Sequence, residues 1–205
     1  MKKTMIAAAV ATAMIMGGTA IAAPKVSSTS ELHWYAGLGA GYSYVQDKQS
    51  HTMDGSHYEG IPGGLAGNVF AGYNFNQYIG MEVSYDDIAN TSTYVADGDG
   101  TLAGGTKYNG IGFGLVGNTP ALHGMRLFVK LGGEYLHGRS FDMNATTNSV
   151  GLAYGAGMSY NITQHLIARG EWKQVLQQKN VSTNIDTTVT VPQMNLFLAQ
   201  LAYSF

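Results

Sequence analysis

A few polar residues have the types and spacing that hydrolytic chemistry would need. Asp86 and Asp87 form an acidic pair that could activate water, and His137 with Ser140 offers a base and a nucleophile. An acidic pair of this kind needs a second catalytic group across a wide site, which this chain does not offer. In an extended chain, a spacing of three residues points His137 and Ser140 to opposite faces. We therefore expect no enzymatic activity and no catalytic residue.

Histidines in one segment could chelate a metal. His51 and His57 flank Asp54, but nothing in the sequence fixes their geometry, and single loop histidines are usually solvated. The chain has no cysteine, so it has neither a thiolate ligand nor a disulfide. The glycines of residues 37–41 are not followed by the Gly-Lys-Ser/Thr of a phosphate loop. We expect no metal and no cofactor.

Ion pairing is the chemistry that six charged side chains favour. Three acids and three bases share one phase of a two-residue alternation, and they are Glu82, Lys130, Glu134, Arg169, Glu171 and Lys173. Side chains in one phase of a strand point to one face, so all six would enter the same interior. Charges in a narrow interior must pair, because an unpaired buried ion costs several kcal/mol. Two interpretations stay open: a plug of ion pairs, or a narrow pore that opens when the pairs rearrange.

Period-two alternation recurs along the chain and predicts the strands that position these side chains. Apolar residues alternate with small or polar ones in eight segments, at residues 34–44, 65–75, 79–86, 108–115, 127–135, 150–160, 166–173 and 196–205. Short links (76–77, 118–124 and 161–164) alternate with long ones (46–64, 88–105, 138–148 and 177–191). The pattern is typical of an all-β fold, an eight-stranded antiparallel up-and-down transmembrane β-barrel.

Alternation alone does not say whether the apolar face meets lipid or the core of a soluble barrel. Aromatic residues gather near strand ends on that face, as two interfacial girdles require. These residues are Trp34, Tyr42, Tyr44, Tyr85, Tyr135, Tyr160, Trp172 and Tyr203. The same face carries essentially no charge, and the opposite face is mostly Gly, Ser and Asn, a poor water-facing surface. We therefore expect the apolar face to point outward into a membrane.

Composition excludes several other classes of protein. Only 12% of the residues are charged and the net charge is −2, which excludes a disordered chain and a nucleic-acid binder. No internal stretch reaches the roughly 18 apolar residues that a membrane helix needs. Residues 1–22 have a basic start, an apolar run and an Ala-x-Ala end, which predict a secretory signal peptide. Residues 23–205 then form the barrel domain.

Motifs along nearly the whole chain resemble the outer membrane protein A family of enteric bacteria. They lie at residues 1–4, 22–25, 34–37, 72–74, 78–82, 85–86, 131–133, 160–163 and 169–171. The resemblance implies a transmembrane barrel whose lumen holds an ion network that includes the positions of Glu82 and Arg169. The family's network also includes a further Lys and Glu, whose positions are occupied here by Gly114 and Ser159. The resemblance therefore does not extend to the family's gate.

The end of the chain also resembles this family. Leu201, Tyr203 and Phe205 are similar to the C-terminal signal by which such barrels are recognised for assembly. Long members of the family continue into a peptidoglycan-binding domain, whereas this sequence stops at Phe205. Wall anchoring is therefore not expected.

We expect a structural and surface-interaction role in the outer membrane of a Gram-negative bacterium, with both termini in the periplasm and the long loops outside. The alternative is a weakly conducting diffusion pore gated by lumen salt bridges. Expected partners are outer-membrane lipid and lipopolysaccharide, the barrel-assembly machinery with periplasmic chaperones, and a host-surface or serum ligand on the loops. We expect a monomer.

Overall fold

The computed structural model describes residues 33–46, 52–53, 56–61, 63–95, 102–140, 146–176, 178–182, 188–191 and 193–205. The regular elements in these ranges are strands, and no helix among them is long and apolar enough to cross a membrane. The predicted signal peptide at residues 1–22 lies outside the described residues. So do His51 and Asp54, together with the side chain of His57.

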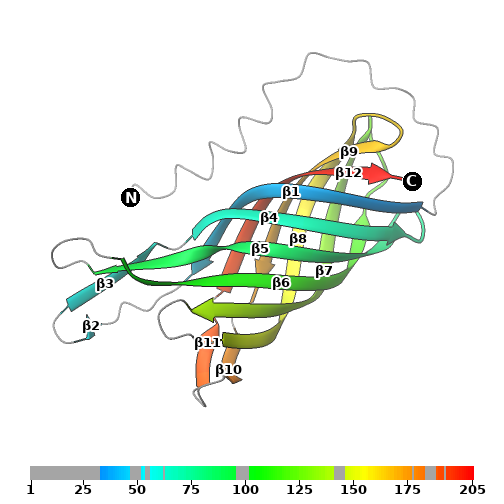
Figure 1. Ribbon diagram of the computed structural model, residues 1–205. Coiled ribbons are helices and arrows are strands. Elements are labelled where there is room, and N and C mark those ends of the chain that lie inside the picture. Colours follow the sequence, from blue (N-terminus) through cyan, green and yellow to red (C-terminus); the bar gives the residue numbers. More distant parts are fainter. Residues whose placement is uncertain are drawn as a thin grey trace.

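Eight long antiparallel strands close into a barrel (Figure 1). In ring order they are β1 (His33–Gln46), β4 (Gly63–Asn74), β5 (Ile79–Val95), β6 (Leu102–Asn118), β7 (Met125–Ser140), β8 (Thr146–Asn161), β9 (Leu166–Val175) and β12 (Gln193–Ser204). Each strand pairs with the next in this order, and β12 pairs with β1 to close the ring. The predicted eight-stranded up-and-down barrel is confirmed.

The two ends of the barrel differ. Short connections at residues 75–78, 119–124 and 162–165 lie at one end, which we call the turn end. In the first of them, the Asn76 side-chain oxygen accepts hydrogen bonds from the backbone N–H groups of Tyr78 and Ile79, each at 2.8 Å. In the second, Gly124 adopts a φ of 82°, which glycine does without steric cost. We call the opposite end the loop end.

Strand pairing reaches further toward the loop end than alternation predicts. The expected link at residues 88–105 is largely strand, since β5 continues to Val95 and β6 begins at Leu102. Four short strands also lie in expected links: β2 (Thr52–Met53), β3 (Ser56–Ile61), β10 (Gln178–Ser182) and β11 (Thr188–Val191). Strand β3 pairs with the last residues of β5, and β10 pairs with β11. Hydrophobic alternation ends where lipid no longer selects it, whereas backbone pairing continues.

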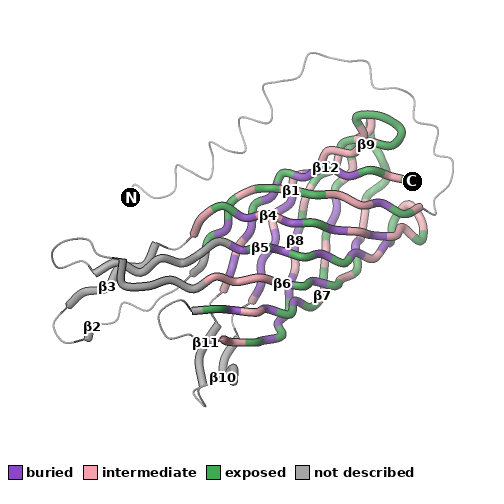
Figure 2. The backbone as a smooth tube through the Cα atoms, in the orientation of Figure 1, coloured by how far each residue is buried: buried purple, intermediate pink, exposed green. Residues whose placement is uncertain are grey.

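The apolar face of the strands points outward. Leu65, Leu131 and Val150 expose 88%, 60% and 71% of their surfaces on the outer wall. The residues that alternate with them point into the barrel and are largely buried, so exposed and buried positions alternate along each strand (Figure 2). A soluble barrel would bury its apolar face, so an outer wall of this kind needs lipid around it. The outward apolar face is confirmed.

Candidate functional site in the filled lumen

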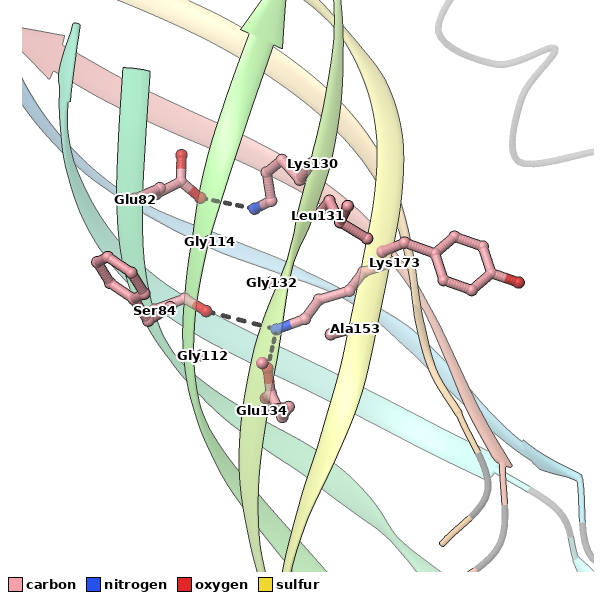
Figure 3. A pocket seen from close by; sticks show the side chains of 13 residues that line it. Glu82, Ser84, Gly112, Gly114, Lys130, Leu131, Gly132, Glu134, Ala153 and Lys173 are labelled. Carbon is pink, nitrogen blue, oxygen red and sulfur yellow. Dashed lines mark hydrogen bonds and ion pairs between the residues drawn. The ribbon is translucent and has the colours of Figure 1, made fainter. Parts of the chain in front are cut away.

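Four charged side chains form a closed set of ion pairs in the middle of the lumen, which we call the ion ring. Lys130 of β7 places its Nζ 2.6 Å from Glu82 Oε1 and 2.5 Å from Glu171 Oε1. Arg169 of β9 places Nη1 2.8 Å from Glu82 Oε2 and Nη2 3.7 Å from Glu171 Oε2. Each base therefore contacts both acids, and the four formal charges cancel. Figure 3 shows the side chains of Glu82 and Lys130 pointing toward each other.

A second set of charges, the Lys173 cluster, lies one layer closer to the loop end. Lys173 of β9 places its Nζ 2.9 Å from Asp86 Oδ2. The same Nζ lies 2.6 Å from Glu134 Oε2 (Figure 3). The Ser84 hydroxyl donates a hydrogen bond to Asp86 Oδ2 at 2.8 Å. One lysine thus holds two carboxylates in a site where both acids are fully buried. The excess negative charge makes Lys173 the member that this cluster cannot lose.

The six sequence-predicted charges all enter these two sets, and Asp86 is the residue that the sequence count omits. The lumen network holds four acids and three bases, so the expected balance of three against three is wrong. Asp86 lies two residues from Ser84 and four from Glu82 on β5, so its side chain points to the same face as theirs. The same alternation that selected Glu82 could therefore have identified Asp86. Its neighbour Asp87 lies on the outer wall, where it pairs with Lys107 at 3.1 Å. The two aspartates therefore do not converge on one substrate.

An aromatic layer closes the lumen on the turn side of the ion ring. The Arg169 guanidinium lies 4.5 Å from the ring centre of Phe128 and 4.7 Å from that of Phe70. Tyr35 stands 5.7 Å from the same group, and its hydroxyl donates a hydrogen bond to Glu82 Oε2 at 2.9 Å. Cation–π contacts of this kind gain strength when water is excluded. The aromatic layer therefore both fills space and stabilises the ion ring.

An apolar layer fills the lumen on the loop side of the Lys173 cluster. Its members come from strands around the barrel and are at most 4% exposed: Ile88, Leu136, Val175, Met194, Leu196 and Leu198. Tyr108 of β6 packs against them. The expected Gly-, Ser- and Asn-rich interior is therefore wrong at this level of the barrel. In β12, Leu196 and Leu198 point inward next to the outward Phe197 and Ala199, so alternation there does not distinguish the inside from the outside.

Glycines of β6 leave the room that the charged side chains occupy. A Cβ on Gly112 would lie 2.6 Å from Glu134 Oε2 and 3.2 Å from Lys173 Nζ. A cavity of about 30 Å³ remains beside the charges, lined by Glu82, Ser84, Lys130, Glu134 and Lys173 among others. That volume holds about two water molecules. It is too small for a substrate or a hydrated ion.

The other candidates lie apart from this interior. His137 and Ser140 belong to β7 rather than to the expected loop, and His137 Nδ1 lies 2.6 Å from Asn148 Oδ1. Seven of the eight girdle candidates, with Leu201 and Phe205, are exposed on the outer wall: Trp34, Tyr42, Tyr44, Tyr85, Tyr135, Tyr160 and Tyr203. The eighth, Trp172, is half-buried and packs edge-on against Tyr154 with ring centres 5.8 Å apart.

Comparison with known proteins places this barrel in a family. The family model for the outer membrane protein beta-barrel domain matches residues 8–205. The chain belongs to this family. Members of the family are outer membrane proteins, so the predicted location in the outer membrane is confirmed.

Sequence relatives agree with this assignment. Outer membrane protein A of Escherichia coli O157:H7 is 27% identical over 213 residues, which cover 100% of this chain and 55% of that protein. Outer membrane protein A of Salmonella typhi is 41% identical over 86 residues, which are 42% of this chain and 22% of that protein. The chain thus spans about half the length of the relatives that it matches from end to end. The resemblance to the outer membrane protein A family is confirmed.

Solved structures of outer membrane barrels share the fold. OprG of Pseudomonas aeruginosa has a TM-score of 0.58 at 14% identity, covering 86% of this chain and 98% of that one. Ail of Yersinia pestis, solved with the heparin analogue sucrose octasulfate, has a TM-score of 0.53 at 17% identity, covering 86% and 100%. At such low identity the likeness concerns the fold alone.

Proposed function

We propose that this protein is a sealed outer-membrane barrel that presents its loop end at the cell surface and does not conduct ions. The filled lumen is the observation that carries the proposal. Going from the turn end to the loop end, the lumen holds the aromatic layer, the ion ring, the Lys173 cluster and the apolar layer. Each layer is contributed by several strands.

The energetics of this filling favour a plug over a gate. Separating one member of a buried ion pair costs roughly 3–5 kcal/mol, because the charge that remains is uncompensated. Rearranging the ion ring would leave the apolar layer in place. A narrow apolar constriction resists hydration and blocks ions by dewetting. The alternative of a pore gated by lumen salt bridges therefore needs two separate barriers to open together.

The proposed role assigns the partners to different surfaces. Outer-membrane lipid, including lipopolysaccharide, would surround the apolar wall, with the exposed aromatic residues at its two interfaces. A host-surface or serum ligand would bind at the loop end, because loops on a rigid scaffold commonly carry recognition. We further propose a monomer with both termini in the periplasm. The barrel-assembly machinery and periplasmic chaperones would recognise the strand that carries Leu201, Tyr203 and Phe205.

A flux measurement tests the seal. The full chain is refolded into liposomes loaded with potassium and a small neutral sugar, and efflux of each is followed against protein-free liposomes. We expect efflux at the rate of the protein-free control. Heat-dependent gel migration of the same sample shows that the barrel is folded. Faster efflux of either solute from folded protein would contradict the proposal.

A further inference from the structure

The formal charges that the structure describes on the outer wall lie in one place. Among the side chains that it describes, three charged ones point outward: Asp87 of β5, Lys107 of β6 and Arg139 of β7. These strands are neighbours in the barrel, and all three residues lie toward the loop end. The described turn-end connections at residues 75–78, 119–124 and 162–165 contain no Asp, Glu, Lys or Arg. The charges therefore form a local patch on one side and at one end.

Two cations of this patch stand side by side. Lys107 and Arg139 are direct partners in the antiparallel register of β6 and β7. Side chains at directly paired positions project from the same face of the sheet, with their Cβ atoms about 4.5–5.5 Å apart, and like charges at such positions repel each other. Asp87 Oδ1 lies 3.1 Å from Lys107 Nζ, in a pair that is about half exposed. Among the side chains that the structure describes, no acid pairs with Arg139, so the charges of Asp87, Lys107 and Arg139 add up to +1.

The patch lies at the depth of a lipid headgroup. Tyr135 is exposed on the same face of β7, and Arg139 follows it by four residues toward the loop end. Four residues of a strand span about 13 Å, and the tilt of barrel strands reduces the distance along the membrane normal to about 10 Å. Aromatic side chains of membrane barrels mark the boundary between hydrocarbon and headgroups. Lys107 and Arg139 then lie just beyond that boundary.

We propose that Lys107 and Arg139 bind a phosphate of an outer-leaflet lipid, which in this membrane is the phosphorylated headgroup of lipopolysaccharide. An anion between the two cations relieves their repulsion, and a guanidinium binds phosphate through two parallel hydrogen bonds. Asp87 holds the Lys107 ammonium on the outer wall but competes with the phosphate for it. The inference deepens the proposed lipopolysaccharide contact and rests on the loop end facing outward.

The test measures binding by the folded full chain. Wild-type protein and the double variant K107Q/R139Q are refolded into phosphatidylcholine nanodiscs, and lipopolysaccharide is titrated in while the heat-induced gel shift is followed. We expect lipopolysaccharide to raise the melting temperature of the wild type. We expect roughly tenfold weaker binding by the double variant, since two exposed charge contacts are lost. Asn148→Ala, a neutral change on the same face of β8, should bind like the wild type.

Further measurements show whether the phosphate belongs to a lipid, and which of the two proposals a negative result would overturn. Dephosphorylated lipopolysaccharide should bind the wild type as weakly as intact lipopolysaccharide binds the double variant. The D87N variant should bind intact lipopolysaccharide at least as tightly as the wild type does. Equal stabilisation of wild type and double variant would overturn this site while leaving the lipopolysaccharide contact standing. No stabilisation of the wild type would overturn that contact as well. Stabilisation of the wild type by inorganic phosphate alone to the same extent would overturn the lipid assignment.

Discussion

Arg169 and Glu82 meet across the full width of the barrel. Their side chains come from β9 and β5, which are separated by three strands in either direction around the ring, and Nη1 lies 2.8 Å from Oε2. The barrel is therefore cross-linked through its lumen as well as around its wall. This contact joins positions 87 residues apart in the sequence.

Removing the arginine should destabilise the folded barrel. Arg169→Ala leaves Lys130 as the one base of the ion ring beside the two acids Glu82 and Glu171, and it removes the cation from the aromatic layer. We expect a loss of roughly 3–5 kcal/mol in the free energy of unfolding, because one partner of a buried ion pair is removed. Urea unfolding in lipid bilayers measures it. Arg139→Ala, which removes an exposed arginine from β7, should change the value by less than about 0.5 kcal/mol without lipopolysaccharide. Equal losses in the two variants would contradict the structural role of the ion ring.

Either acid of the Lys173 cluster should be able to pair with Lys173 when the other acid is removed. Asp86→Asn and Glu134→Gln each leave Lys173 one carboxylate, so each single change should cost little. The double change leaves a buried lysine without an acid and should cost more than the two single losses together, by roughly 0.5–3 kcal/mol. A double-mutant cycle on unfolding free energies gives this interaction energy. Simple additivity would show that the two carboxylates do not share Lys173.

A methyl group should be tolerated on the outer wall and not in the lumen. Gly112→Ala would bring its Cβ within 2.8 Å of Ser84 Oγ and 2.6 Å of Glu134 Oε2. We expect a loss of about 1–3 kcal/mol from overpacking. Gly170→Ala is the matched control, because nothing lies within 4 Å of its added Cβ. We expect it to be neutral or slightly stabilising in the same unfolding assay, and a reversed order would contradict the inward orientation of Gly112.

The outward face should respond to charge according to depth. Leu131 lies midway along β7 and is 60% exposed, whereas Leu122 lies in the connection at residues 119–124 and is 68% exposed. Leu131→Arg should cost about 2–4 kcal/mol and Leu122→Arg about 0–1 kcal/mol, because charge is most costly at the bilayer midplane. Unfolding free energies in bilayers measure both. Similar costs at the two positions would mean that this wall is not embedded as proposed.

Alternation was sufficient to predict the wall of the barrel. In a membrane barrel the outward phase is selected by lipid, so Leu127, Val129 and Leu131 alternate clearly with Phe128 and Lys130. The same selection is absent beyond the bilayer. Strands β5 and β6 therefore run into segments that the pattern assigns to links. The extra length is rich in residues such as Thr93 and Tyr94, which favour strands without alternating.

The lumen was predictable in its charges but not in its packing. The phase of the strands places Glu82 and Arg169 in one interior, yet it does not say which acid meets which base. Which side chains pair depends on their positions along the barrel axis, and the register between neighbouring strands sets these positions. The apolar layer could not be predicted from alternation, because inward residues such as Leu196 and Leu198 stand next to outward residues that are also apolar. Only closure of the barrel shows that they are buried.

Single-channel conductance in a planar bilayer tests the sealed lumen most directly. The full chain is refolded and its folding is verified by heat-dependent gel migration, and wild type and Arg169→Ala are recorded under the same voltage. The sealed barrel predicts no discrete current steps from folded wild type. It predicts none from folded Arg169→Ala either, because the apolar layer of Ile88, Leu136 and Leu196 remains in place. Discrete steps from folded wild type would contradict the proposal and make the lumen a pore.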